Sequence, residues 1–301
     1  MIGYLYLLIA LFAGATKGFC GKKTSDKLIG TSDAMLVNTV RMVFCVLIGL
    51  SVVAVQGEWG QLFVGSDVLF ISFISGVTTA IFVVTWLLYV RQGAYAMLDL
   101  FLLVSVVIPI LLCYFLYGEP IKIAQWIGIG LLILSGFVMS SYNTSIKGKM
   151  SIKAKILLLL CTVSCGLSDF SQKLFVRTAP EVEIAVFSLY SYAVSGVLLF
   201  VFYVFLYRKE KKREAIQSPT KLISSIFGYV FVMAGCLFVH SYFKTAATKH
   251  LDAAEIYPLS QGGSLILTLF MSVFFFKERI NIKAVLGIAL CFLSLLVINL
   301  A

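Results

Sequence analysis

Ionisable side chains stand close together in an otherwise apolar region near the end of the chain. His240 and Lys244 are four residues apart and therefore share one face of a helix, and Glu255 follows after a short turn. A lysine can hold an anionic group, and a carboxylate or an imidazole can take up and release a proton. Ionisable residues within apolar spans cost about 2.5–3.5 kcal/mol each on insertion scales and usually face the interior of a helix bundle. We therefore predict that Lys244 attracts an anionic group and that Glu255 carries protons.

The alternative is that Lys244 and Glu255 lie at the ends of their helices with their charges in water. His240 is either a ligand or proton site or a core histidine with satisfied hydrogen bonds.

A polar stripe continues from this group. Tyr257, Gln261 and Ser264 recur at helical spacing, Pro258 frees a backbone carbonyl beside them, and the Gly262–Gly263 pair permits close approach of another helix. We predict that this stripe lines a cavity.

Other candidate binding residues are dispersed along the chain. Asp169 and Lys173 are four residues apart, so they either neutralise each other, the interpretation we favour, or leave Asp169 to bind a cation. Trp86 and Tyr89, with Thr85, either form an aromatic wall of the cavity or serve in ordinary helix packing. Arg41 lies within an apolar run, and Asp99 caps a helix or lines a cavity.

Composition identifies the solvent of this chain as lipid. Its 301 residues are 60% hydrophobic and only 13% charged, with a mean hydropathy of +1.01, whereas soluble domains carry about 25% charged residues. Apolar runs long enough to cross a hydrocarbon core of about 30 Å recur along the whole sequence. The fold class is therefore an all-α polytopic membrane protein. We place ten transmembrane helices near residues 3–20, 33–55, 66–90, 94–117, 121–141, 153–173, 183–207, 219–244, 251–276 and 281–300.

Basic residues predict the orientation of these helices. With ten spans, seventeen of the 24 Lys and Arg residues fall on one face, among them Lys147, Lys149, Lys212, Arg213, Lys277 and Arg279. The opposite face receives Lys122, Lys173, Arg177, Lys244 and Lys249. By the positive-inside rule the richer face is cytoplasmic and both termini lie outside. The basic residues are dispersed over several loops, which argues against a nucleic-acid partner.

The sequence contains an internal echo. Residues 115–131 (FLYGEPIKIAQWIGIGL) and 274–290 (FFFKERINIKAVLGIAL) share the pattern E-x-I-x-I followed by a Gly-bearing apolar helix. We expect Glu119 and Glu278 to complement the dipoles of the helices they precede. Each copy ends a set of five helices, and an odd number of spans reverses the orientation of the second set. The sequence therefore predicts two inverted five-helix repeats, over residues 1–143 and 150–301.

These features together resemble the drug/metabolite transporter superfamily in its ten-helix EamA-like branch. The resemblance rests on chain length, span count, the repeated E-x-I-x-I pattern and the shared F-x-x-K at residues 19–22 and 170–173. It implies export or exchange of small polar metabolites or drugs through a central cavity, often driven by an ion gradient.

We therefore expect a secondary active transporter that moves amino-acid-like or anionic metabolites, or drugs, by alternating access with a proton or sodium gradient. The chain contains no GxxxxGK[ST] loop for ATP, and we expect no cofactor, no metal and no catalysis. The alternatives are an intramembrane enzyme, which would need His240, and a membrane receptor or scaffold. Partners would be the substrate, the coupling ion and membrane lipid, with the protein a monomer or a homodimer. The compact loops favour a prokaryotic plasma membrane.

Overall fold

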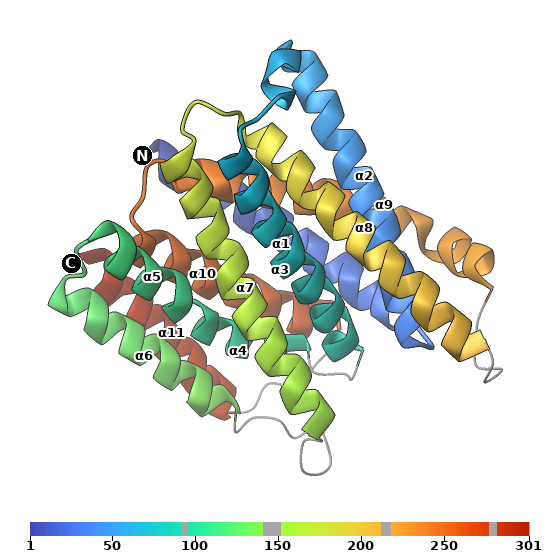
Figure 1. Ribbon diagram of the computed structural model, residues 1–301. Coiled ribbons are helices and arrows are strands. Elements are labelled where there is room, and N and C mark those ends of the chain that lie inside the picture. Colours follow the sequence, from blue (N-terminus) through green and yellow to red (C-terminus); the bar gives the residue numbers. More distant parts are fainter. Residues whose placement is uncertain (92–94, 141–151, 212–217, 277–281, 301) are drawn as a thin grey trace.

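A computed structural model describes residues 1–91, 95–140, 152–211, 218–276 and 282–300. Within these ranges the chain forms a bundle of helices (Figure 1). The helices are α1 (Ile2–Ser25), α2 (Thr31–Gln56), α3 (Ser66–Val90), α4 (Tyr95–Ser105), α5 (Val107–Tyr117), α6 (Ile123–Ser140), α7 (Ile152–Thr178), α8 (Ile184–Lys211), α9 (Pro219–Ala247), α10 (Ala253–Phe274) and α11 (Ile282–Leu300), with a short 3₁₀ helix at Trp59–Leu62. The predicted boundary between the two repeats, at residues 143–150, and Glu278, Lys147, Lys149, Lys212, Arg213, Lys277 and Arg279 lie outside the described residues.

Helix is the structure that an apolar chain adopts in lipid, because each backbone N–H and C=O then bonds within its own segment. Among the described residues, seven helices are long and apolar enough to cross a membrane: α1, α2, α3, α7, α8, α9 and α10. The other three predicted spans correspond to shorter apolar stretches at Phe101–Tyr117, Ile123–Ser135 and Val285–Ile298. The chain is thus a polytopic α-helical membrane protein, and the count of ten spans stays a prediction.

The segment predicted as one helix over 94–117 consists of two. α4 ends at Ser105 and α5 begins at Val107. Pro109 explains the break, because its nitrogen carries no hydrogen for the Ser105 carbonyl and its ring crowds the preceding turn. Gly166 of α7 packs directly against this point. A Cβ at Gly166 would lie 2.7 Å from the Ser105 carbonyl oxygen and 2.8 Å from Ile108 Cβ.

Helices of the first and second halves interleave, and the contacts come in reciprocal pairs. α1 packs on α9, and its counterpart α7, the first helix of the second half, packs on α3. α2 packs on α8, α4 on α10 and α6 on α11, which are the pairs that the predicted repeat would make equivalent. Neither half therefore forms a core by itself, and the centre of the molecule is built from both.

The close approach of α7 to the α4–α5 break predicts sensitivity to added volume. Gly166→Ala places a methyl group against backbone, so we expect it to lower the free energy of unfolding by about 1–3 kcal/mol, as overpacking does elsewhere. Gly130→Ala is the matched control, because a Cβ there has no neighbour within 4 Å among the described residues. The two variants are compared by thermal unfolding in lipid–detergent micelles. Equal unfolding temperatures would contradict the prediction.

Candidate functional site

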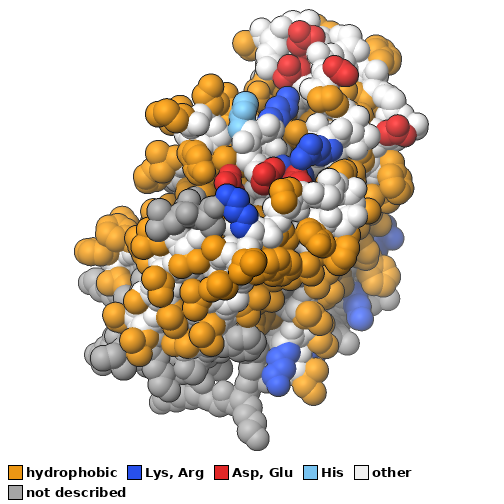
Figure 2. All heavy atoms as spheres, turned by 90° about the vertical axis from the view of Figure 1, so that its left-hand side faces the viewer, with side chains coloured by type: hydrophobic (Ala, Val, Ile, Leu, Met, Phe, Trp, Pro, Cys, Tyr) orange, Lys and Arg blue, Asp and Glu red, His pale blue; other side chains and the backbone are white. Residues whose placement is uncertain are grey.

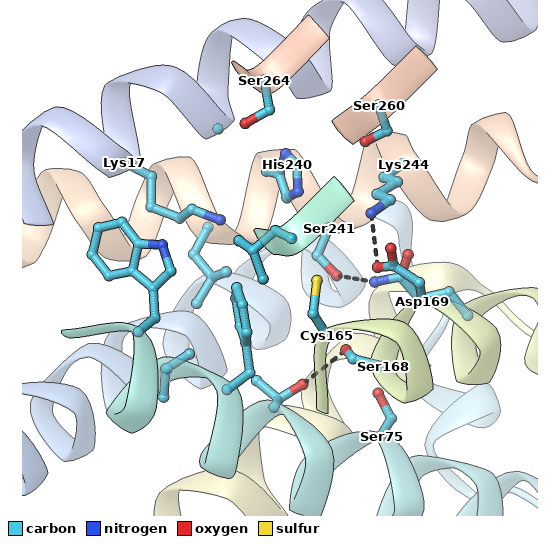
Figure 3. A pocket seen from close by; sticks show the side chains of 18 of the residues that line it. Lys17, Ser75, Cys165, Ser168, Asp169, His240, Ser241, Lys244, Ser260 and Ser264 are labelled. Atoms are coloured by element: carbon cyan, nitrogen blue, oxygen red, sulfur yellow. Dashed lines mark hydrogen bonds and ion pairs between the residues drawn. The ribbon is translucent and has the colours of Figure 1, made fainter. Parts of the chain in front are cut away.

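A cavity lies where the two halves meet. Its empty space, including the part that opens to the outside, is about 950 Å³. Seven helices contribute to its wall: α1, α3, α4, α7, α8, α9 and α10. Among the predicted site residues, Trp86, Asp169, His240, Lys244 and Gln261 line it. Figure 3 shows how the labelled side chains from these helices converge.

Asp169 of α7 and Lys244 of α9 form a buried ion pair at the edge of this cavity. Lys244 Nζ donates to Asp169 Oδ1 over 2.7 Å, and the two side chains are only 3% and 6% exposed. The favoured prediction that Asp169 pairs with Lys173 is therefore wrong, and so is the alternative that Lys244 keeps its charge in water. The second carboxylate oxygen, Asp169 Oδ2, is buried without a hydrogen-bond partner in the described part of the chain.

Lys17 of α1 supplies a second amine to the cavity. Its side chain lies among those that line the cavity (Figure 3), and no hydrogen bond or ion pair of Lys17 occurs within the described residues. Our choice of site residues omitted Lys17. The available signal was its position, a lysine within an apolar span.

The carboxylate of Asp99 in α4 also faces the cavity and accepts a hydrogen bond from the Thr268 hydroxyl of α10. Asp99 is 7% exposed. Of the two roles considered for Asp99, lining the cavity is the one its position supports, because it lies inside the bundle rather than at a helix start. The cavity is thus lined by two basic and two acidic side chains, those of Lys17, Lys244, Asp99 and Asp169.

His240 of α9 lines the cavity while its ring is already engaged. Its Nδ1 lies 2.8 Å from the Ala10 carbonyl oxygen of α1. A carbonyl can only accept, so Nδ1 carries the proton in this contact. Gly14 leaves the space that the ring occupies, because a Cβ there would lie 2.9 Å from Nδ1. The contact favours a positioned core histidine, and a ligand or proton role for His240 stays a prediction.

Hydroxyl and amide groups form most of the remaining polar wall. Gln261 donates from Nε2 to Cys165 Sγ over 3.5 Å. Other polar side chains of the wall are Ser75, Thr79, Ser168, Gln172, Ser188, Ser191, Ser241, Ser260 and Ser264. Ser188 Oγ, Ser191 Oγ and Gln172 Oε1 are buried without a partner among the described residues.

Four predicted site residues do not line the cavity. Tyr89 is 1% exposed and packs in the apolar core between α3 and its neighbours. Arg41 is buried in α2 and is not part of the cavity wall. Tyr257 is fully buried and donates its hydroxyl to the Asp169 carbonyl over 2.9 Å. Glu255 is half-buried in the first turn of α10, so its role in proton coupling stays a prediction without support from its position.

Glu119, between α5 and α6, joins both halves of the chain. Its Oε1 accepts from Arg177 Nη2 over 2.8 Å and lies 3.0 Å from Lys173 Nζ. Its Oε2 accepts from the Ala253 amide over 2.8 Å, at the start of α10. The expectation that Glu119 complements the helix it precedes therefore needs correction: its carboxylate binds the N-terminus of α10 in the other half.

Figure 2 views the molecule from the side of the N-terminus and shows acidic and basic side chains gathered in a largely hydrophobic surface.

Among the described residues, no group of three or more His, Cys, Asp and Glu side chains is arranged to hold a metal ion. The cavity offers hydrogen bonds and charges of both signs, which is the chemistry of reversible binding.

Comparison with known proteins identifies a protein family from the sequence and a similar fold among solved structures. The sequence matches the EamA-like transporter family over residues 1–141 and 152–300. A solved crystal structure is similar to this chain with a TM-score of 0.71 and 17% sequence identity, covering 99% of this chain and 96% of that one. A search among curated proteins finds no match.

The buried ion pair predicts a strong dependence of stability on charge balance. Asp169→Asn leaves Lys244 buried without a counter-charge, which elsewhere costs about 3–5 kcal/mol. We expect the double variant Asp169→Asn, Lys244→Met to recover most of that loss, because no charge remains to be neutralised. Thermal unfolding of the single and double variants in lipid–detergent micelles measures the difference. Equal losses in both would show that the pair does not control stability.

Glu119 predicts a pH dependence. Burial would raise the pKa of Glu119, but hydrogen bonds from the Ala253 amide and Arg177, together with the charge of Lys173, bring it below its ordinary value of 4.5. A carboxyl whose pKa is lower in the folded state stabilises that state above pH 4.5 and loses this contribution as the pH falls through the folded value. We expect the difference in unfolding temperature between the chain and its Glu119→Gln variant to be full at pH 7 and to shrink below pH 4.5. A difference that stays constant would contradict this assignment.

Proposed function

This chain belongs to the EamA-like transporter family and is an integral membrane transporter of the drug/metabolite type. We propose that it is a secondary active transporter that exports or exchanges small polar metabolites or drugs. The favoured substrates are anionic or amino-acid-like metabolites. One observation carries the proposal: the cavity between the two halves presents the Lys17 amine without a protein partner among the described residues. A charge inside a bundle is costly, and an anionic group of a bound substrate would supply a counter-charge for this amine.

The remaining cavity groups support a substrate that also carries hydrogen-bond donors. Asp169 Oδ2 and Gln172 Oε1 are hydrogen-bond acceptors by chemistry, and neither has a partner within the described residues. An ammonium or hydroxyl group of the substrate would satisfy them while its anionic group contacts Lys17. This pattern of one free amine and free acceptors suits a zwitterion or a hydroxylated anion.

Alternating access is the mechanism that the reciprocal packing supports. Equivalent helices pair across the halves, and α1 on α9 is mirrored by α7 on α3. A bundle built from two inverted copies has two related arrangements, one open to each side of the membrane. The basic loops would face the cytoplasm, with both termini outside.

The coupling ion would be a proton or sodium carried by a cavity carboxylate. Asp99 and Asp169 are the acidic side chains of the cavity wall, so they are better placed than Glu255 to exchange an ion with the substrate site. The pairing of Asp169 with Lys244 makes Asp99 the first of the two to test.

Replacement of Lys17 tests the proposal directly. We expect Lys17→Met to abolish the metabolite accumulation that the chain produces in the medium of an overproducing bacterial host. The reason is loss of the amine that contacts the anionic group. Untargeted mass spectrometry of the medium makes the measurement, with membrane abundance matched between variants. Lys23→Met is the control, since Lys23 lies on the same helix and outside the cavity wall.

Accumulation of the same compound with Lys17→Met as with the unchanged chain would sink the assignment of Lys17. An effect of Lys23→Met equal to that of Lys17→Met would also contradict it, because the loss would then follow from any change of charge in α1.

A further inference from the structure

A second pocket lies at the end of the bundle, separated from the central cavity by about one helical turn. Its wall includes Lys173 and Val176 of α7, Thr248 after α9, and Asp252 before α10. The central cavity is lined on the same two helices by Asp169 and Gln172 of α7 and by Lys244 of α9. Residues four apart in a helix are about 6 Å apart along its axis. Only one layer of side chains per helix therefore separates the two pockets.

Next to the central cavity, the layer that separates the two pockets consists of the Lys244–Asp169 ion pair. It joins α9 to α7 over 2.7 Å. Tyr257 of α10 closes the third side. Its hydroxyl bonds to the Asp169 carbonyl, and Lys244 Nζ lies 5.8 Å from the centre of its ring. Side chains from three helices, α7, α9 and α10, therefore contact one another at one level.

The outer part is held by Lys173. Its amine donates to the Leu251 carbonyl over 2.9 Å and to the Thr248 carbonyl over 3.3 Å, and it lies 3.0 Å from Glu119 Oε1. These contacts use all three N–H donors of the lysine. Glu119 in turn binds Arg177 and the Ala253 amide. The outer layer therefore joins the α5–α6 connection, α7 and the α9–α10 connection.

We propose that the substrate path runs between the central cavity and this end pocket, and that the two ionic layers form a gate that is closed in this structure. This inference rests on the proposed transport function. Both layers cross the same boundary, between α7 on one side and α9 with α10 on the other. Opening requires α7 to separate from them, so the Lys244–Asp169 ion pair and the hydrogen bonds from Lys173 to the Thr248 and Leu251 carbonyls break together. Glu119, Lys173 and Tyr257 are then positioning residues of the gate, and none of them lines the central cavity.

Thiol accessibility tests the gate, because Cys165 lines the central cavity. A membrane-impermeant maleimide is applied to intact cells and to inverted vesicles. The reporter variant Lys249→Cys, at an exposed residue of the end pocket, identifies the preparation in which that pocket faces the reagent. In that preparation, the labelling rate of Cys165 is the rate measured for each variant minus the rate for the same variant that also carries Cys165→Ser.

We expect Glu119→Gln to raise the labelling rate of Cys165 several-fold, because it removes the charge that holds the outer layer. Glu183→Gln is the matched control. Glu183 lies just before α8 and forms no ion pair among the described residues. An unchanged rate with Glu119→Gln, or an equal rise with Glu183→Gln, would overturn the gate.

Arg177→Gln provides a second variant in case Glu119→Gln does not fold. The Arg177 side chain is 48% exposed, so its replacement disturbs packing little, and we expect a smaller rise in Cys165 labelling. An unchanged rate in every folded variant would overturn the proposal. Labelling and export report different properties. Unchanged labelling together with export that still depends on Lys17 would remove the gate and leave the proposed function. Faster labelling of Cys165 without any export would support the gate and contradict the proposed function.

Discussion

Charge compensation in an apolar bundle is the constraint on which this structure depends. An isolated charge inside a membrane protein is expensive, so each one needs a counter-charge, a set of hydrogen bonds or a polar cavity. The chain meets this requirement with bonds between helices that are far apart in sequence. Asp169 bonds to Lys244, and Glu119 bonds to Lys173 and Arg177. The charges therefore specify which helices of the apolar bundle are neighbours, and they concentrate at the junction of α7, α9 and α10.

Apolar packing provides the surroundings in which those charges act. Helices of the first half pack on helices of the second: α2 on α8, α4 on α10, α6 on α11, α1 on α9 and α3 on α7. Glycines allow the closest approaches: Gly76 faces the Ser191 backbone, Gly128 faces Ile298, and Gly166 faces the α4–α5 break. Small residues at helix contacts are the usual means of tight association in lipid, where burial of apolar area gives little driving force. A polar cavity with a rigid wall can then persist at the centre of the bundle.

The sequence predicted the class of protein and the position of most helices, because long apolar runs are a direct physical signal. It also predicted several cavity residues, since an ionisable group in such a run faces inward. It did not predict partners. Asp169 was expected to pair with Lys173, four residues away, yet both form their ion pairs with other segments. Local spacing shows which side chains share a helix face, whereas the choice of partner depends on the rotation and neighbours of each helix. The serines of the wall other than Ser264 were missed for a related reason: in lipid, a serine can also bond to the carbonyl one turn back, as Ser164 does with Leu160.

The interleaving of the halves has a consequence for biosynthesis. α1 packs against α9, which the ribosome completes about 200 residues later; at about 5–20 residues per second, that is a wait of roughly 10–40 seconds. During this time Lys17 has no cavity to face, and the Ala10 carbonyl and Gly14 have no His240 ring beside them. The early helices must therefore be held at the insertion machinery or in loose association within the bilayer. Assembly of this protein is limited by the arrival of its last third, and a chain interrupted there would leave unpaired polar groups in lipid, the kind of surface by which quality-control proteases recognise incomplete membrane proteins.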